Sequence, residues 1–241
     1  SSLLTAHGFR HGFSLRTGGV SEGAFASANL GRALGDLPEH VEENHRRLAA
    51  AVGYEQVFEV SQVHGAMLRQ VRIGQAPEVV RQEEADGVFA VEPGVAVGIR
   101  VADCVPILMA VKGTSRVAAV HAGWRGVEAG IAGRAAVTIL GGRGAEELLV
   151  AIGPHIRMPR FEVGEEVATR LEAVSYGADA IDRSRPKPHV DLAAIVSAQL
   201  QTIGVTQIDD VGGCTYDEAD DFFSYRRDGG TTGRHLAVVV G

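Results

Sequence analysis

Apolar residues recur every three or four positions in four stretches of the chain, and this spacing predicts four helices with one buried face. The first covers Pro38–Val52, where a proline opens the helix and Gly53 follows it. The last begins after Asp191, whose side chain suits the N-cap position, and ends before Gly204. The other two run from after Gly126 to Gly141 and through the apolar positions Val163, Val167, Leu171 and Val174.

Other stretches are short runs of apolar and β-branched residues without clean alternation, typical of strands covered on both faces. The spacing of the runs between Val88 and Val120 favours antiparallel hairpins, so the sheet is expected to be mixed. No linker divides the chain, so we predict an α/β fold in a single domain over residues 1–241. The expected strands are Val57–Val60, Leu68–Ile73, Gly87–Val91, Val95–Val101, Val105–Val111, Val117–His121, Leu148–Ile152, Gln207–Val211 and Leu236–Val240.

The composition of the chain excludes several classes of protein. It has 23 basic and 30 acidic side chains, and the net charge of -7 argues against a nucleic-acid partner. No apolar run reaches the roughly 18 residues of a membrane helix, and Ser1–Leu4 lacks the charged start of a signal peptide. We therefore expect a cytoplasmic protein without a membrane partner; its oligomeric state stays open. The only cysteines, Cys104 and Cys214, are too few for a disulfide framework or a four-cysteine zinc site.

The chain has none of the common catalytic motifs, but three polar segments interrupt its apolar strands. Phosphate-binding loops, dinucleotide fingerprints, C-x-x-C, H-E-x-x-H, G-x-S-x-G and H-x-H are all absent. The polar segments are Ser61–Gly65, Ala102–Cys104 and His121–Gly126. Each places a histidine or a cysteine at the end of a strand, where a rigid scaffold presents functional side chains.

His64, Cys104 and His121 from these segments form a candidate metal set. Two imidazoles and one thiolate, with water as the fourth ligand, are a pattern of catalytic zinc. The same residues can instead be a buried thiol with two hydrogen-bonded histidines. In a third interpretation, Cys104 is a nucleophile that one of the histidines activates. The spacing alone does not separate the three.

Three further segments contain arginine beside glycine or aromatic residues. Gly123–Gly126 opens a helix, and its free N–H groups and Arg125 suit a phosphate or a carboxylate, although a structural ion pair would explain Arg125 equally well. Arg16 precedes a glycine turn that can be a plain hairpin. In Phe222–Arg234, aromatic rings and arginines can stack on a base and bind phosphate, or can divide between the core and surface ion pairs.

Taken together, these segments resemble the YfiH-like family, also called the laccase-domain or multicopper polyphenol oxidoreductase family and later recognised as purine nucleoside phosphorylases. The matching pieces follow in order over nearly the whole chain, and Val120–Gly126 is distinctive by itself. They are Gly12–Gly19, Phe25–Gly31, Gln62–Gly65, Ala85–Gly87, Ala102–Cys104, His121–Gly126, Ala151–Pro154, Phe161–Gly164, Cys214-Thr215 and Phe222–Gly229.

The resemblance implies a layered α/β sandwich with mixed β-sheets and flanking helices, and zinc held by His64, Cys104 and His121. It also implies phosphorolysis of purine nucleosides (adenosine, inosine, guanosine and methylthioadenosine) and deamination of adenosine at one site. The partners would then be a purine nucleoside and phosphate. Polar positions of the motifs are assigned to catalysis at Cys104, Asp103 and Arg125, and to substrate binding at Arg16, Asn29, Gln62 and Arg226.

One departure from the family bears on the metal, and it leaves rival functions to weigh. Many members have cysteines where this chain has His155–Arg160, which weakens any copper chemistry and polyphenol oxidation. The second hypothesis is a cysteine or zinc amide hydrolase that removes a wrong amino acid from a cell-wall precursor. A zinc-stabilised binding module without turnover is the non-enzyme alternative.

Overall fold

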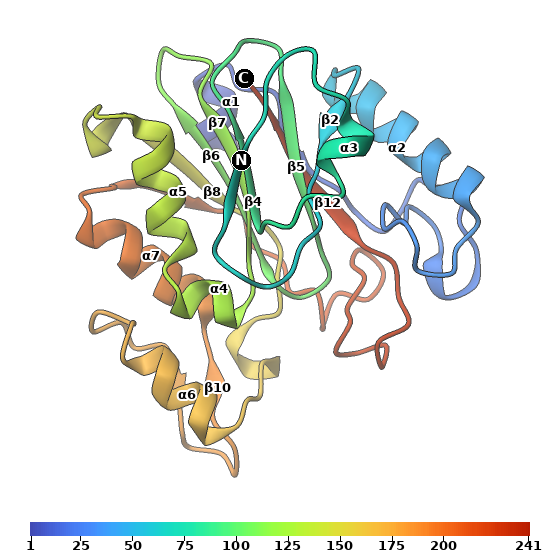
Figure 1. Ribbon diagram of the computed structural model, residues 1–241. Coiled ribbons are helices and arrows are strands. Elements are labelled where there is room, and N and C mark those ends of the chain that lie inside the picture. Colours follow the sequence, from blue (N-terminus) through green and yellow to red (C-terminus); the bar gives the residue numbers. More distant parts are fainter.

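Two β-sheets pack face to face at the centre of the computed structural model, which describes residues 1–241 (Figure 1). The smaller sheet has the order β1 (His11–Phe13), β12 (His235–Val240), β5 (Ala96–Val101) and β2 (Val57–Phe58). The larger sheet has the order β11 (Gln207–Asp210), β8 (Leu148–Ile152), β6 (Val105–Val111), β7 (Val117–Ala122), β4 (Gly87–Ala90) and β3 (Leu68–Gln70). A separate two-stranded ribbon pairs β9 (Ile181–Asp182) with β10 (His189–Val190).

Both sheets are mixed, as the sequence predicts. In the larger sheet β7 pairs antiparallel with β6 and with β4, whereas β11 runs parallel to β8. The hairpin expectation between Val88 and Val120 holds only in part. β5 lies in that stretch but joins the smaller sheet, where it pairs with β12 and β2. The chain therefore changes sheets between β4 and β5 and again between β5 and β6.

The central strands are buried on both faces, which explains why their sequences do not alternate. Every residue of β6 and β7 is buried. In β6, Ile107 and Met109 belong to a core of 26 buried residues shared with the helices, and Leu108 and Ala110 to a second core of 20 residues between the sheets. Because successive side chains point to opposite faces, one apolar strand supplies both cores.

Helices cover the outer faces of the two sheets. α5 (Ile131–Leu140) and α7 (Leu192–Thr202) pack on the larger sheet, and α2 (Pro38–Val52) covers the smaller one (Figure 1). The layers are thus helix, sheet, sheet and helices, which confirms the predicted sandwich. The predicted first and last helices are also confirmed, and the Asp191 side chain caps α7 by accepting the Ala194 N–H at 2.9 Å.

The prediction of one helix from Gly126 to Gly141 is wrong. Two helices occupy this stretch, α4 (Trp124–Glu128) and α5, separated by Gly130 with φ of 70°. The third predicted helix is shorter than its apolar positions suggest, since α6 covers Glu165–Glu172. The sequence analysis missed α1 (Ser2–Ala6), α3 (Pro77–Val80) and the strands β1, β9 and β10, all of them five residues or fewer.

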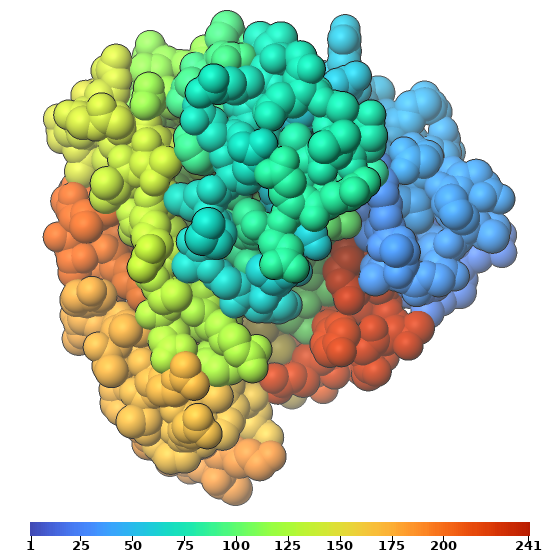
Figure 2. Space-filling view, viewed as in Figure 1, coloured from blue at the N-terminus to red at the C-terminus, as the bar shows by residue number.

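The segment that precedes β12 reaches the surface beside the N-terminal region, as the red and blue atoms in Figure 2 show. Segments far apart in the sequence thus meet on one side of the molecule. None of the helices combines the length and the apolar character needed to cross a membrane.

Candidate metal centre and its pocket

The pairing of β6 with β7 brings Cys104 and His121 together. Their antiparallel register places Pro106 opposite His121, so the start of β6 lies beside the end of β7. Cys104 directly precedes β6, and His64 comes from the loop after β2. The ligand atoms of His64, Cys104 and His121 all lie within 4.8 Å of one another, which confirms that the three residues predicted as a set share one place.

Gly123 is the residue that lets this cluster close. A Cβ atom at this position would lie 2.8 Å from His64 Nδ1 and 3.2 Å from Cys104 Sγ. Gly123 is also the residue from which α4 begins. Any larger side chain there would displace two of the three ligands.

Asp86 is the residue that orients two of the three ligands. Its Oδ1 atom lies 2.8 Å from His121 Nδ1 and accepts the backbone N–H of His64 at 2.9 Å, while Oδ2 accepts the N–H of Gly65 at 2.6 Å. The carboxylate is fully buried. It directs His121 Nε2 toward the cluster, as carboxylates that accept the other ring N–H do for metal-binding histidines. The sequence analysis gave Asp86 no role, although an acid at the start of a buried strand was a signal.

The cluster stabilises a thiolate. Burial alone would raise the pKa of the Cys104 thiol, but the charges and hydrogen bonds of His121 and His64 lower it to about 6. Burial would lower the pKa of His121, but Cys104 and Asp86 together raise it to about 9. Burial likewise opposes ionisation of Asp86, yet its bonds to His121 and to the Gly65 and His64 amides lower its pKa. At neutral pH the metal-free cluster is therefore a thiolate beside an imidazolium.

The donor set of the cluster fits a transition metal with an open coordination position. One thiolate and two imidazoles are ligands that zinc takes, and three protein ligands leave a fourth position for a small molecule. This is the one group of three or more histidine, cysteine and acidic side chains in the structure whose atoms are close enough to hold an ion.

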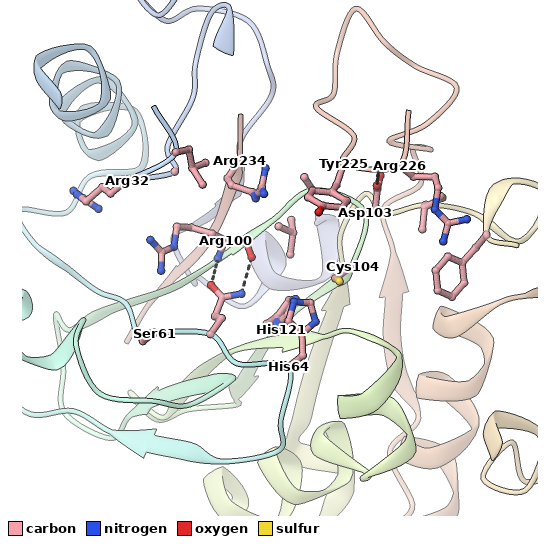
Figure 3. A pocket seen from close by; sticks show the side chains of 17 residues that line it. Arg32, Ser61, His64, Arg100, Asp103, Cys104, His121, Tyr225, Arg226 and Arg234 are labelled. Atoms are coloured by element: carbon pink, nitrogen blue, oxygen red, sulfur yellow. Dashed lines mark hydrogen bonds between the residues drawn. The ribbon is translucent and has the colours of Figure 1, made fainter. Parts of the chain in front are cut away.

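The cluster opens into a pocket of about 590 Å³ that is rich in arginine (Figure 3). Four arginines line it, and Asp103 is the one acidic residue among its 17 lining residues. Two aromatic rings, Phe161 and Tyr225, line it as well. The arginines are Arg32, Arg100, Arg226 and Arg234.

Three predicted site residues besides the ligands line this pocket. The side-chain amide of Gln62 donates from Nε2 to the Arg100 carbonyl at 2.7 Å and accepts the Arg100 N–H at Oε1 at 2.8 Å. Asp103 accepts the hydroxyl proton of Thr215 and the backbone N–H of Arg226, each at 2.7 Å. The Arg226 guanidinium lies over the ring of Phe161, 5.4 Å from its centroid.

Three other predicted site residues lie outside the pocket lining. Arg16 donates to the carbonyls of Ala26 and Ala219, and the exposed Arg125 stacks on Trp124 at 4.4 Å. Asn29 is fully buried, and its Oδ1 atom accepts the backbone N–H groups of Gly31 and Arg234, both of which line the pocket. The second cysteine, Cys214, is buried away from the cluster, with Sγ 3.3 Å from Asp217 Oδ2.

The sequence analysis missed two of the pocket's arginines for which signals existed. Arg100 interrupts the apolar run of β5, where a charge needs a reason. Arg234 lies at the end of the segment Phe222–Arg234, for which the sequence left two alternatives open: base stacking with phosphate binding, or a division between the core and surface ion pairs. Tyr225 of that segment lines the pocket, whereas Phe222 and Phe223 are buried and Arg227 pairs with Asp228.

Comparison with known families gives one match that covers nearly the whole chain. A family model described as "Multi-copper polyphenol oxidoreductase laccase" matches residues 10–241. A protein of Deinococcus radiodurans named "Purine nucleoside phosphorylase" is 38% identical over 232 residues, 95% of this chain and 88% of its own. The Escherichia coli protein "Purine nucleoside phosphorylase YfiH" is 38% identical over 228 residues, 94% of this chain and 91% of its own.

Solved structures share the fold. YlmD from Geobacillus stearothermophilus superposes with a TM-score of 0.88 at 34% identity, covering 95% of this chain and 90% of its own. A Bacillus licheniformis protein described as "hypothetical protein YfiH" gives a TM-score of 0.90 at 26% identity, over 95% of this chain and 91% of its own.

Proposed function

This chain belongs to the multi-copper polyphenol oxidoreductase laccase family, which includes the YfiH proteins, and from this premise we propose that it is a zinc-dependent purine nucleoside phosphorylase. The names of its relatives support an enzyme of this class, with a nucleoside and phosphate as substrates. We extend the proposal to adenosine, inosine, guanosine and methylthioadenosine as nucleosides, and to deamination of adenosine at the same site.

The observation that carries the proposal is the cluster of His64, Cys104 and His121 at an arginine-rich pocket of suitable size. A pocket of about 590 Å³ lies within the range that holds a small organic ligand. When zinc is bound by these three residues, it acts as a Lewis acid with one open coordination position. Asp86 holds the histidines in place for this role.

The protein's own side chains would bind and orient both substrates. Phe161 and Tyr225 offer ring faces on which a purine can stack. Arg226, the one arginine among the predicted site residues that lines the pocket, adds charge beside Phe161. In phosphorolysis, a phosphate oxygen forms a bond to the anomeric carbon while the bond from that carbon to the purine nitrogen breaks. Positioning the two substrates supplies much of the acceleration for such a displacement.

The leaving purine takes up a proton, and Asp103 is the group we assign to relay it from the hydrogen phosphate that attacks. It is the one carboxyl group that lines the pocket. The Thr215 hydroxyl and the Arg226 N–H fix its orientation. A positioned acid of this kind lowers the barrier for a poor leaving group.

The test is a nucleoside screen on purified protein whose bound metal has been quantified. We expect release of adenine or hypoxanthine, together with pentose 1-phosphate, from adenosine and inosine when phosphate is present. Omission of phosphate should abolish release of the base. Inosine formed from adenosine without phosphate would report deamination separately. If neither nucleoside yields a free base in phosphate with the metal-loaded protein, the phosphorylase proposal is wrong.

The cluster also supports a second candidate, a thiol-dependent amide hydrolase. The observation that favours it is the lowered pKa of Cys104, about 6, beside His121. A thiolate at neutral pH is the form that attacks a carbonyl carbon. Cys104→Ser separates the two candidates when metal content and amide hydrolysis are measured on the same sample. Hydrolysis that disappears while the metal is retained would support a nucleophile.

A further inference from the structure

Among the four arginines of the pocket, Arg234 combines burial with the absence of any acidic partner. Arg32 and Arg100 share the buried carboxylate of Glu59, at 2.7 and 3.3 Å. Arg226 has no ion pair either, but it is exposed, and its Nη1 atom donates to the Glu162 carbonyl at 3.0 Å. Arg234 is half-buried, and no carboxylate lies within ion-pair distance of it.

The hydrogen bonds of Arg234 leave one edge of its guanidinium free. Nη1 donates to the carbonyls of Thr232 and Gly233, at 2.8 and 3.0 Å, and Nε and Nη2 make no hydrogen bond. These two nitrogens form the edge that makes paired bonds to a carboxylate or a phosphate. Elsewhere in this chain the same edge is occupied. Arg46 uses it for both oxygens of Glu43, at 2.7 and 2.8 Å.

The side chain of Arg234 is held in place for this role. Its backbone N–H donates to the buried Asn29 side chain at 2.9 Å, and its carbonyl accepts the N–H of Leu30 at 3.0 Å. The stem passes closely over Gly31, where an added Cβ would lie 2.8 Å from Arg234 Cγ. The guanidinium lies over the ring of Tyr225, 5.5 Å from its centroid. A positioned arginine loses little conformational freedom when it binds an anion.

Arg100 adds a second free donor to the same pocket. Its Nη2 atom donates to the Val60 carbonyl at 2.9 Å and its Nε atom faces Glu59, which leaves Nη1 without a hydrogen bond. In Figure 3 the Arg234 guanidinium lies above the cluster that contains Cys104, whereas the Arg100 side chain extends away from the cluster, toward the side of Arg32. Glu59, which is 1% exposed, holds Arg100 in this orientation.

We propose that Arg234, with Arg100, forms a tetrahedral oxyanion subsite in this pocket, and that Glu59 and Asn29 are its positioning residues. The inference rests on the proposed function, in which this oxyanion is the phosphate co-substrate. The same chemistry would also bind the phosphoryl group of a nucleoside monophosphate. Of the three arginines expected from the sequence, Arg16 and Arg125 do not contribute to the subsite, because neither lines the pocket.

The test compares binding of inorganic phosphate with turnover in Arg234→Lys and in a matched control, Arg143→Lys. Arg143 is a half-exposed surface arginine paired with Glu147. Lysine keeps the charge but lacks the paired donors. By calorimetry in phosphate-free buffer, we expect Arg234→Lys to weaken phosphate binding at least tenfold and the control to leave it unchanged. In turnover, KM for phosphate should rise at least tenfold and KM for the nucleoside less than twofold.

The outcomes separate this inference from the proposed function. Phosphate binding that depends on Arg234 without any phosphorolysis would support the subsite and contradict the phosphorylase. Tighter binding of adenosine monophosphate than of adenosine, lost in Arg234→Lys, would support the subsite with a nucleotide as the source of the oxyanion. If Arg234→Lys melts like the wild type and binds phosphate and adenosine monophosphate as the wild type does, the subsite is wrong. In that case the subsite would be wrong even if phosphorolysis were observed.

Discussion

Cys104 and Cys214 are the two thiols of this chain, and their surroundings differ at the scale of single atoms. Cys104 lies among two imidazoles that lower the pKa of its thiol to about 6, whereas Cys214 is buried beside Asp217. Thiolates bind metals and thiols do so poorly. The two cysteines should therefore respond very differently to the same substitution.

We predict that Cys104→Ser lowers the affinity for zinc by at least about tenfold. Cys104 would contact the metal directly, and even the loss of a residue that only orients a ligand typically costs about that much. Cys214→Ser is the matched control and should keep the wild-type metal content. Both can be measured by elemental analysis after equilibration with a competing chelator. Equal metal content in the two variants would contradict the assignment of Cys104 as a ligand.

Asp86→Asn tests the carboxylate behind the cluster. The amide has the same shape but no charge, so it stabilises the metal-bound form of His121 less well. We predict a loss of zinc affinity of roughly 10- to 100-fold. Asp179→Asn changes an exposed acid that has no ion pair, and should leave the affinity as it is. Zinc affinity of Asp86→Asn within twofold of the wild type would exclude the orienting role.

His235 makes a prediction about pH and stability. Its ring is buried, Nε2 accepts the Phe223 N–H at 2.8 Å, and burial lowers its pKa to about 3. Since the unfolded ring takes up a proton near pH 6.5, the unfolded state binds more protons as the pH falls from 6.5 toward 3. The contribution of His235 to the free energy of unfolding is therefore fully present above pH 6.5. It declines below that pH and is about 2 kcal/mol smaller at pH 5.

The measurement is urea unfolding at pH 7 and pH 5. His235→Gln retains an acceptor for the Phe223 N–H, so its loss of stability between the two pH values should be about 2 kcal/mol smaller than in the wild type. His7→Gln removes an exposed histidine and should behave like the wild type. An identical pH dependence in all three proteins would show that His235 is not a neutral buried group.

Single residues also show what the sequence could not predict about the site. His64, Cys104 and His121 were identified as candidate ligands by their residue types and their positions at strand ends, because the ability to bind a metal depends on the type of side chain. Arg234 lies near Cys104, which is more than a hundred residues away in the sequence. Asp86 is bonded to His121, which is 35 residues away. The sequence does not show whether a carboxylate faces a given arginine. In the structure Arg100 faces Glu59, whereas Arg234 faces no carboxylate.

At the scale of elements, helices with clear signals at both ends were predicted well. α2 covers the expected residues because Pro38 opens it and Gly53, with φ of 85°, ends it. The strands β6 and β8 also have their predicted bounds. The break at Gly130 was not predicted, although it is local: the glycine adopts φ of 70° between the two helices. The transfer of β5 to the smaller sheet was not predicted because it is set by packing between distant segments rather than by local periodicity.

Asp191 at the start of α7 allows a prediction about one element alone. Its side chain satisfies the Ala194 N–H, one of the donors that a helix leaves open at its first turn. We predict that Asp191→Ala lowers the free energy of unfolding by about 1 kcal/mol. Asp191→Ser retains an acceptor and should cost less. Zinc content should be unchanged in both, because α7 supplies no residue to the cluster. Equal free energies of unfolding in urea for Asp191→Ala and Asp191→Ser would exclude the cap.

At the scale of the whole molecule, the site is a meeting point of distant segments that the core has already fixed. The pocket takes residues from the loop before α2, the loop after β2, the end of β5 and the loop that leads to β6, the end of β7, and the segments after β8 and before β12. Two cores of 26 and 20 buried residues hold these elements together. No metal ligand is among the buried members of either core, although Cys104 packs against the smaller one, so the fold should not depend on a bound ion.

We therefore predict that chelation removes activity but leaves a cooperatively folded protein. Metal that binds only the folded state adds about 2.7 kcal/mol when its free concentration is a hundred times Kd, which corresponds to a rise in Tm of roughly 5–10 °C for a chain of this size. The chelated protein should keep its far-UV circular dichroism and melt in one transition below that of the zinc-loaded protein. Small zinc domains behave differently, because their folding free energy is mostly metal binding. A collapse of secondary structure on chelation at 25 °C would mean that the ion, and not the two cores, holds the strand ends together.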